Sequence, residues 1–222
     1  MNKPNMRDSP EGVVFRPYED GDMDRIVGFA VQSWHLKSDT ILRGTEEAVM
    51  NQYVGLALPV SNWRIVASLD GVVVGAAFGM MSRAYRKESF FSATRSELAL
   101  PIKLLVDERC KIPRRCRAVL SYVLTELKLA LNISGYDAVL TLLLVDESYR
   151  GRGIGRALTD RFVEFAKETG GSLAMVYTDD VASNWRFYKE YGFRKANVFR
   201  DNWSSFYNGT RTNGIIFDLK LK

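Results

Sequence analysis

The chain has 222 residues, of which 46% are hydrophobic, so it is long enough to bury a sizeable core. Its formal net charge of +5 comes mostly from dispersed basic residues, so we do not expect a nucleic-acid-binding protein. No run approaches the roughly 18 consecutive apolar residues of a membrane helix, and the N-terminal segment shows no secretory signal pattern. We therefore expect a cytoplasmic protein with no membrane contact.

The first third of the chain predicts one strand, two helices and a hairpin. Apolar residues recur at helical spacing after Asp22, which is a suitable residue to start a helix. The pair Asp70-Gly71 separates two apolar runs and is a strong signal for a two-residue hairpin turn. The expected bounds are a strand at 13–16, helices at 22–34 and about 45–54, and strands at 64–69 and 72–81.

The rest of the chain alternates between predicted helices and strands after a segment, 82–116, to which no element is assigned. A clear amphipathic helix follows over 117–131, with an apolar face made of Val119, Leu120, Val123, Leu124, Leu127 and Leu131. Further elements are expected at 137–145 (strand), 153–169 (helix), 172–178 (strand), 183–191 (helix), 195–199 and 214–221 (strands). No repeat or linker divides the chain, so we predict one domain over 1–222 with an enlarged segment at about 82–131.

Few side chains are available for metal binding or for histidine-based catalysis. Cys110 and Cys116 have neither zinc-ligand nor redox spacing, and His35 is the single histidine. A serine hydrolase would have to use His35, but no G-x-S-x-G motif accompanies it. We therefore expect no metal site and no hydrolase triad.

A glycine-rich segment, Arg150-Gly151-Arg152-Gly153-Ile154-Gly155-Arg156-Ala157, joins the buried strand at 137–145 to the next predicted helix. Glycines allow a tight turn that presents backbone N–H groups at the positive end of a helix dipole. The three arginines add positive charge around these N–H groups. This arrangement predicts a site for a phosphate or pyrophosphate.

Two common phosphate-binding motifs do not fit this segment. A P-loop requires Gly-Lys-Ser/Thr, whereas Gly155 is followed by Arg156-Ala157. A dinucleotide fingerprint requires glycine or alanine at position 156 or 158, which are arginine and leucine. The pattern that remains is Arg-x-x-Gly-x-Gly after a strand, although a simple strand-to-helix turn is the structural alternative.

In this pattern the sequence resembles the GNAT N-acetyltransferase superfamily, whose acetyl-CoA signature is Gln/Arg-x-x-Gly-x-Gly/Ala. Arg150, Gly153 and Gly155 fill the fixed positions of that signature. The segment 183–193, with Tyr188 and Tyr191 before Gly192-Phe193, resembles a later motif of the same family. The implied fold is α/β (α+β), with a mixed, mostly antiparallel twisted sheet, helices on both faces and a splayed parallel strand pair at the cofactor cleft.

The resemblance also implies which residues contact acetyl-CoA. The pyrophosphate is expected on the backbone of 150–156, and the pantetheine arm beside Val145, whose N–H is assigned to the oxyanion. The implied contacts are Leu143, Leu144, Val145, Arg150, Gly151, Arg152, Gly153, Ile154, Gly155, Arg156, Asn184 and Tyr188. For Asn184, helix capping is an equally good interpretation.

The sequence suggests one general acid and two candidates for the general base. Tyr188 is expected to be the general acid for the leaving thiolate, because a phenol with a pKa near 10 is protonated at neutral pH. Asp137 and then Glu147 are the candidates for the general base, and an ordinary solvated carboxylate is the first interpretation of each taken singly. Side chains that could line an acceptor pocket, or else serve as core and surface residues, are Trp34, His35, Tyr85, Phe90 and Phe91.

The resulting functional prediction is an acetyl-CoA-dependent N-acetyltransferase that acts on a primary amine of a small molecule or protein. The alternative is a non-catalytic sensor or regulatory module that binds acetyl-CoA or CoA. The sequence does not identify the acceptor. From the family resemblance, a homodimer is a further expectation for this protein.

Overall fold

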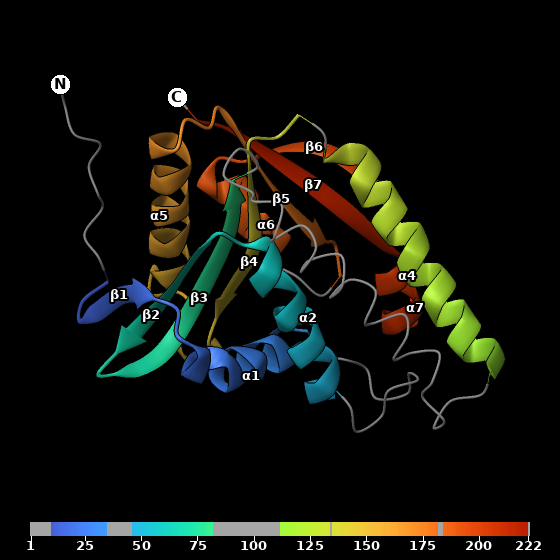
Figure 1. Ribbon diagram of the computed structural model, residues 1–222, viewed down its shortest axis with the longest axis horizontal. Coiled ribbons are helices and arrows are strands. Elements are labelled where there is room, and N and C mark those ends of the chain that lie inside the picture. The colour runs from blue at the N-terminus through green and yellow to red at the C-terminus, as the bar shows by residue number, and fades with distance from the viewer. Residues whose placement is uncertain (1–9, 35–45, 82–111, 134, 182–183, 222) are drawn as a thin grey trace.

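The computed structural model describes residues 10–34, 46–81, 112–133, 135–181 and 184–221 (Figure 1). The elements in chain order are β1 (Val13–Pro17), η1 (Asp20–Asp22), α1 (Met23–Ser33), α2 (Glu46–Val60), β2 (Trp63–Leu69), β3 (Val72–Met81), α4 (Ile112–Asn132), β4 (Ala138–Val145), η3 (Glu147–Tyr149), α5 (Ile154–Glu168), β5 (Leu173–Asp179), α6 (Trp185–Tyr191), β6 (Arg194–Asp201), α7 (Asn202–Asn208) and β7 (Thr212–Lys220). The short helix α7 was not expected from the sequence. Within the described ranges, no helix has the length and apolar character that crossing a membrane requires.

The described strands form one sheet in the order β1-β2-β3-β4-β5-β7-β6. Every neighbouring pair is antiparallel except β4 and β5. Helices α5 and α6 pack against one face, and α1 and α2 against the other, which gives two separate hydrophobic cores (Figure 1). The predicted fold class, a mostly antiparallel mixed sheet with helices on both faces, is therefore confirmed.

A β-bulge in the middle of β4 changes the core to which the leucine side chains of this strand belong. Leu140 pairs with Gly79 and Leu142 with Phe78, so Thr141 is an extra residue on β4. Leu140 belongs to the core beneath α5, whereas Leu142 and Leu144 belong to the core beneath α1 and α2. An extra residue reverses the side-chain alternation, which explains this exchange of faces.

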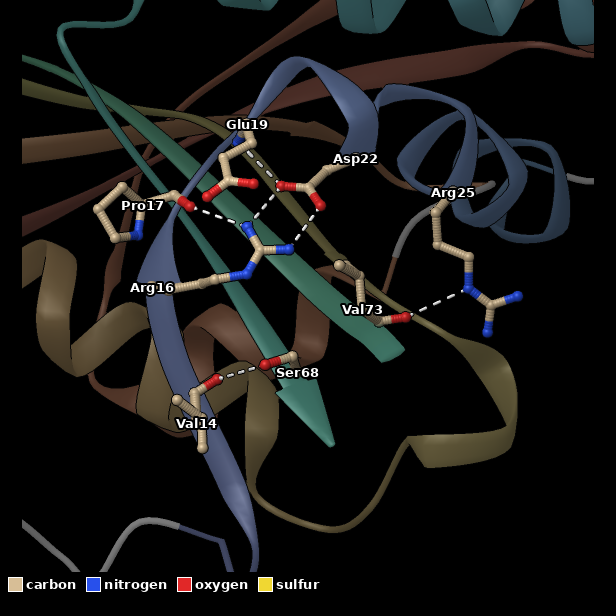
Figure 2. Close-up of polar contacts among 8 residues, drawn as sticks. All are labelled: Val14, Arg16, Pro17, Glu19, Asp22, Arg25, Ser68 and Val73. Atoms are coloured by element: carbon tan, nitrogen blue, oxygen red, sulfur yellow. Dashed lines mark hydrogen bonds and ion pairs between the residues drawn. The ribbon is translucent and has the colours of Figure 1, made fainter. Parts of the chain in front are cut away.

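The helix α1 is anchored to the edge of the sheet by a bidentate ion pair between Arg16 and Asp22 (Figure 2). The two guanidinium nitrogens of Arg16 donate to the carboxylate oxygens of Asp22 at 2.7 and 2.8 Å. The backbone N–H of Glu19 donates to the same carboxylate at 2.9 Å. These donors, with Arg16 first among them, hold the pKa of Asp22 below its ordinary value.

This lowered pKa predicts a pH-dependent contribution to stability. A carboxyl with a depressed folded-state pKa stabilises the fold above its unfolded pKa of about 3.9 and loses that contribution as the pH falls through the folded value. We expect Asp22→Asn to unfold at lower denaturant concentration than the parent at neutral pH. The difference should shrink steadily below about pH 4, and an unchanged difference in denaturation midpoints down to acid pH would contradict the assignment.

Candidate functional site

The parallel strands β4 and β5 separate at the bulge, and this opens the sheet. They pair only over Ala138–Leu140 and Ala174–Val176, although β4 continues to Val145 and β5 to Asp179. The N–H of Asp146 donates to Val74 of β3 at 3.0 Å. Because N–H groups alternate along an antiparallel ladder, those of Val145 and Leu143 point to the other side, into the opening. The site therefore begins with backbone groups of β4 that face the opening beyond the last β4–β5 pair.

The glycine-rich segment forms a turn that delivers the chain to the N-terminus of α5. Gly151 and Gly153 have φ angles of 79° and 82°, a backbone region that other residues rarely adopt. Gly153 is the N-cap residue, and no side chain caps the helix there. The first turn also contains no acidic residue. The positive end of the helix dipole is thus available to an anion.

Three arginines surround this helix end without forming an ion pair to any described carboxylate. Arg150 donates to the backbone oxygen of Val145 at 3.2 Å. Arg152 stacks on Tyr149, and Arg156 stacks on Tyr191, with 5.0 and 5.2 Å between guanidinium carbon and ring centroid. Their positive charges are consequently not neutralised by the described carboxylates, as an anion site requires.

The glycine-rich turn at 150–156 and the N-terminus of α5 are hereafter called the cradle. Two polar links connect α1 to the end of β4 that precedes the cradle. Arg25 donates to Asp146 at 2.9 Å and to the backbone oxygen of Val73 at 3.2 Å, the second of which Figure 2 shows. Asp146 is buried and its other oxygen accepts the N–H of Ser148 at 2.9 Å. Arg150 donates to Ser33 Oγ at 2.7 Å. Both ends of the turn into the cradle are therefore held in place by α1.

We expect Arg25→Ala to destabilise the protein more than removal of an exposed ion-pair arginine. It would leave the buried Asp146 carboxylate without its charged partner, which should cost about 1–3 kcal/mol because Arg25 itself is half exposed. Arg194→Ala is the control, since Arg194 is 72% exposed in its pair with Asp218 and its removal should barely change the midpoint of denaturation. If the two variants lower the midpoint of urea denaturation equally, the Arg25–Asp146 pair stabilises the protein no more than an exposed ion pair does.

Tyr188, on α6, lies where the opening meets the core beneath α5. Its ring packs edge-on against Phe193 and beside Phe217, with centroids 5.9 and 6.0 Å apart. Burial raises the pKa of the Tyr188 phenol, and the nearby Tyr53 phenol raises it further. Tyr53 belongs to α2 on the opposite face of the sheet. The influence of Tyr53 on Tyr188 is electrostatic, because no hydrogen bond or ring contact joins these two described residues.

The helices at this opening meet at Gly155. A Cβ built on Gly155 would lie 3.7 Å from Val145 and 3.8 Å from Phe187, the residue before Tyr188. These are ordinary contacts, so packing within the protein does not by itself require glycine at this position. The end of β4, the N-terminus of α5 and the helix α6 thus surround one cleft.

A protein-family model described as the Acetyltransferase (GNAT) family matches residues 5–193. The chain belongs to the GNAT acetyltransferase family. It is accordingly an acyltransferase that uses acetyl-CoA. No curated protein sequence matches the chain significantly.

Solved structures of GNAT acetyltransferases and related proteins share the fold over nearly the whole chain. SsHAT has a TM-score of 0.64 at 18% identity, and the match covers 95% of this chain and 99% of that one. An agmatine N-acetyltransferase has a TM-score of 0.57 at 16% identity, covering 95% and 100%. The Salmonella typhimurium protein yncA, solved with its cofactor acetyl-CoA, has a TM-score of 0.54 at 14% identity, covering 96% and 95%.

The residues of this GNAT chain fit acetyl-CoA. The uncapped N-terminus of α5 and the three unneutralised arginines suit a pyrophosphate. The N–H groups of Leu143 and Val145 suit a pantetheine amide because they face the opening. The side chain of Leu144 is buried in the core beneath α1 and α2, and its contact with the cofactor stays a prediction.

The other predicted site residues are not all brought together. Glu147 lies at the cleft end of β4 in η3, is exposed, and contacts no described residue through its carboxylate. Asp137 lies at the opposite end of β4, where its carboxylate accepts the backbone N–H groups of Ser172 and Leu173 at 2.9 and 3.2 Å. Asn184 is the exposed N-cap residue of α6 but makes no side-chain capping bond. Only Glu147 of the two proposed bases is near the cradle.

Sequence reasoning missed a group of residues on α2, α4, β5 and the end of β6, centred on Tyr53 and hereafter called the acceptor side. Although Tyr53 is 42% exposed, desolvation of its phenol and then the carboxylates of Asp179, Glu126 and Asp201 raise its pKa. Asp179 ends β5, and a clue existed, because the carboxyl ends of parallel strands meet at one edge of a sheet. Trp34 packs edge-on against Tyr53, with ring centroids 4.8 Å apart. The other acceptor-side candidates, His35, Tyr85, Phe90 and Phe91, lie outside the described residues.

Proposed function

We propose that the protein transfers the acetyl group to a primary amine that carries positive charge when it enters the cleft. Acetyl-CoA supplies the acetyl thioester when it is bound. The observation that carries the proposal is the opening between β4 and β5, where the Tyr188 phenol is influenced by the Tyr53 phenol, on which three carboxylates act in turn.

Tyr188 is the proposed general acid for the leaving thiolate. Its phenol makes no hydrogen bond with any described residue, and burial keeps it protonated through the neutral range by raising its pKa. Its ring is fixed between Phe187, Phe193 and Phe217, so the hydroxyl has a defined position. A positioned donor of this kind is what general acid catalysis requires.

The amine must lose a proton before it can react. An amine with a pKa near 10.4 is almost fully protonated at pH 7, and its deprotonation costs about 4.6 kcal/mol. Glu147 is the proposed base, directly or through water, because it lies at the cleft end of β4. Asp137 has no part in this proposal, because it is at the far end of that strand and occupied by backbone N–H groups.

The acceptor side supports a cationic substrate rather than a carboxylic acid. Asp179 and Asp201 are buried, and with Glu126 they act on the Tyr53 phenol. Tyr177 donates to Asp201 at 2.7 Å, so this phenol belongs to the same group. The Asp201 carboxylate already accepts hydrogen bonds from Thr125, Tyr177 and Ser204, so it acts here as a negative charge and not as a direct ligand. Negative charge near the Tyr53 phenol favours an ammonium group over a carboxylate. Glu126 belongs to α4, which supports a role for the enlarged segment 82–131 in acceptor binding.

An amine panel tests the proposal through release of the free CoA thiol. We expect turnover with at least one diamine or other cationic primary amine, and little with neutral or acidic amines of similar size. Acceptor-dependent release only with acidic amines would contradict the acidic side of the cleft. Tight acetyl-CoA binding with no amine-dependent release would favour a sensor over an enzyme acting on amines.

A further inference from the structure

Helix α4 is amphipathic as predicted, but its apolar face points away from the rest of the protein. The exposed large side chains recur at spacings of three and four residues, which places them on one face of the helix. They are Leu120, Val123, Leu124, Leu127 and Leu131, hereafter the α4 face. Leu120, Leu127 and Leu131 are 58%, 56% and 81% exposed.

Polar contacts on the other side of the helix explain this orientation. Thr125 is buried and donates to Asp201 at 3.0 Å, and it accepts the backbone N–H of Trp203 at 3.0 Å. Lys128 donates to the backbone oxygen of Arg200 at 3.0 Å. Tyr122 is also buried on this side and packs edge-on against Trp203, with ring centroids 5.7 Å apart. These contacts bind α4 to β6 and α7 (Figure 1) through the side opposite the leucines, which are left outside.

The size of the α4 face is appropriate for a small interface. Its five side chains expose on the order of 500 Å² of apolar surface, which is near the upper end for a patch on a monomer. Two such faces packed together would remove on the order of 1,000 Å² from water, which is the lower limit for a specific protein interface. An amphipathic helix normally buries such a stripe against another element.

The charges at the two ends of the α4 face favour a second copy of the same helix in an antiparallel arrangement. Arg117 is exposed at one end of the α4 face, and the last turn of the helix contains no basic residue to neutralise its carbonyl end. If a second α4 packs antiparallel about an axis between Val123 and Leu124, Leu120 meets the partner's Leu127, and Arg117 meets the partner's carbonyl end. A cation next to a helix C-terminus is favourable, and a two-fold axis makes the same contact twice.

We propose that the protein forms a homodimer in which the α4 faces of two copies pack antiparallel, with the two-fold axis near Leu124. Light scattering after size exclusion should give twice the chain mass for the parent. Leu124→Glu/Leu127→Glu should give a monomer that acetyl-CoA still stabilises in a thermal shift. Val14→Glu is the matched control, since Val14 is 62% exposed on β1 and its replacement should leave the dimer intact.

Cysteine cross-linking tests the direction of packing with variants that keep a small apolar side chain. In a Cys110→Ser/Cys116→Ser background, Leu124→Cys should form a disulfide-linked dimer on mild oxidation, whereas Leu131→Cys should not link to itself. Self-linking at both positions would indicate parallel packing and overturn the proposal. A monomeric parent would also overturn it, with residues 82–111, a lipid surface or another protein then covering the α4 face. A Leu124→Glu/Leu127→Glu variant that remains dimeric would overturn the proposal as well.

Discussion

Tyr188→Phe should lower the rate of acetyl transfer by about 10²–10⁴-fold in a single-turnover assay, with little change in the Michaelis constant for acetyl-CoA. Phenylalanine keeps the ring between Phe193 and Phe217 but removes the proton that we assign to the leaving thiolate. Because the hydroxyl is asked to act mainly in the transition state, the loss should appear in the rate rather than in binding. Single-turnover conditions are needed because product release can limit kcat.

Tyr191→Phe on the same helix is the matched control. The Tyr191 hydroxyl donates to Asp160 at 2.6 Å, so its removal breaks a real hydrogen bond and should affect stability. It should leave the single-turnover rate close to that of the parent, because Asp160 lies on α5 and this hydroxyl is already committed to it. If both variants are slowed equally, or if Tyr188→Phe is not slowed, Tyr188 is a packing residue and water is the proton donor.

Gly153→Asp should weaken acetyl-CoA binding by at least about 100-fold in isothermal titration calorimetry. The substitution places a negative charge at the uncapped N-terminus of α5, and like charges brought together in a binding site cost several kcal/mol. It also forces a side chain onto a backbone with φ of 82°, which lowers stability by about 1–2 kcal/mol.

A control separates charge in the cradle from backbone strain. Gly170→Asp adds the same side chain at nearly the same φ, 81°, just beyond the other end of α5, where a Cβ meets no atom within 4 Å. It should lower the melting temperature about as much as Gly153→Asp while leaving the affinity for acetyl-CoA unchanged. If Gly153→Asp binds acetyl-CoA as tightly as Gly170→Asp does, the pyrophosphate site is not at the N-terminus of α5.

Local patterns were enough to predict most of the fold. The apolar run of β4, the Asp70-Gly71 turn and the glycines before α5 each carry their signal within a few residues, and each was predicted correctly. The bulge at Thr141 could not be predicted in this way, because one extra residue in a continuous apolar run changes no sequence pattern. That the whole chain is a single domain stays a prediction.

The candidate site was likewise predictable only where its residues lie within local motifs. The cradle and Tyr188 lie within two short motifs, so spacing alone could indicate them. The acceptor side is assembled from α2, α4, β5 and the end of β6, and no local pattern connects Tyr53 with Asp179 or Asp201. The outward face of α4 had the expected periodicity, but periodicity does not say which face is covered.

The product formed from isotope-labelled acetyl-CoA tests the central claim most directly. The reaction would be run with the best amine of the panel and analysed by mass spectrometry before and after hydroxylamine treatment. We expect the label on the acceptor as an amide that hydroxylamine does not remove, formed at a rate that falls with Tyr188→Phe. Label recovered only as free acetate or as a hydroxylamine-sensitive ester would contradict transfer to an amine.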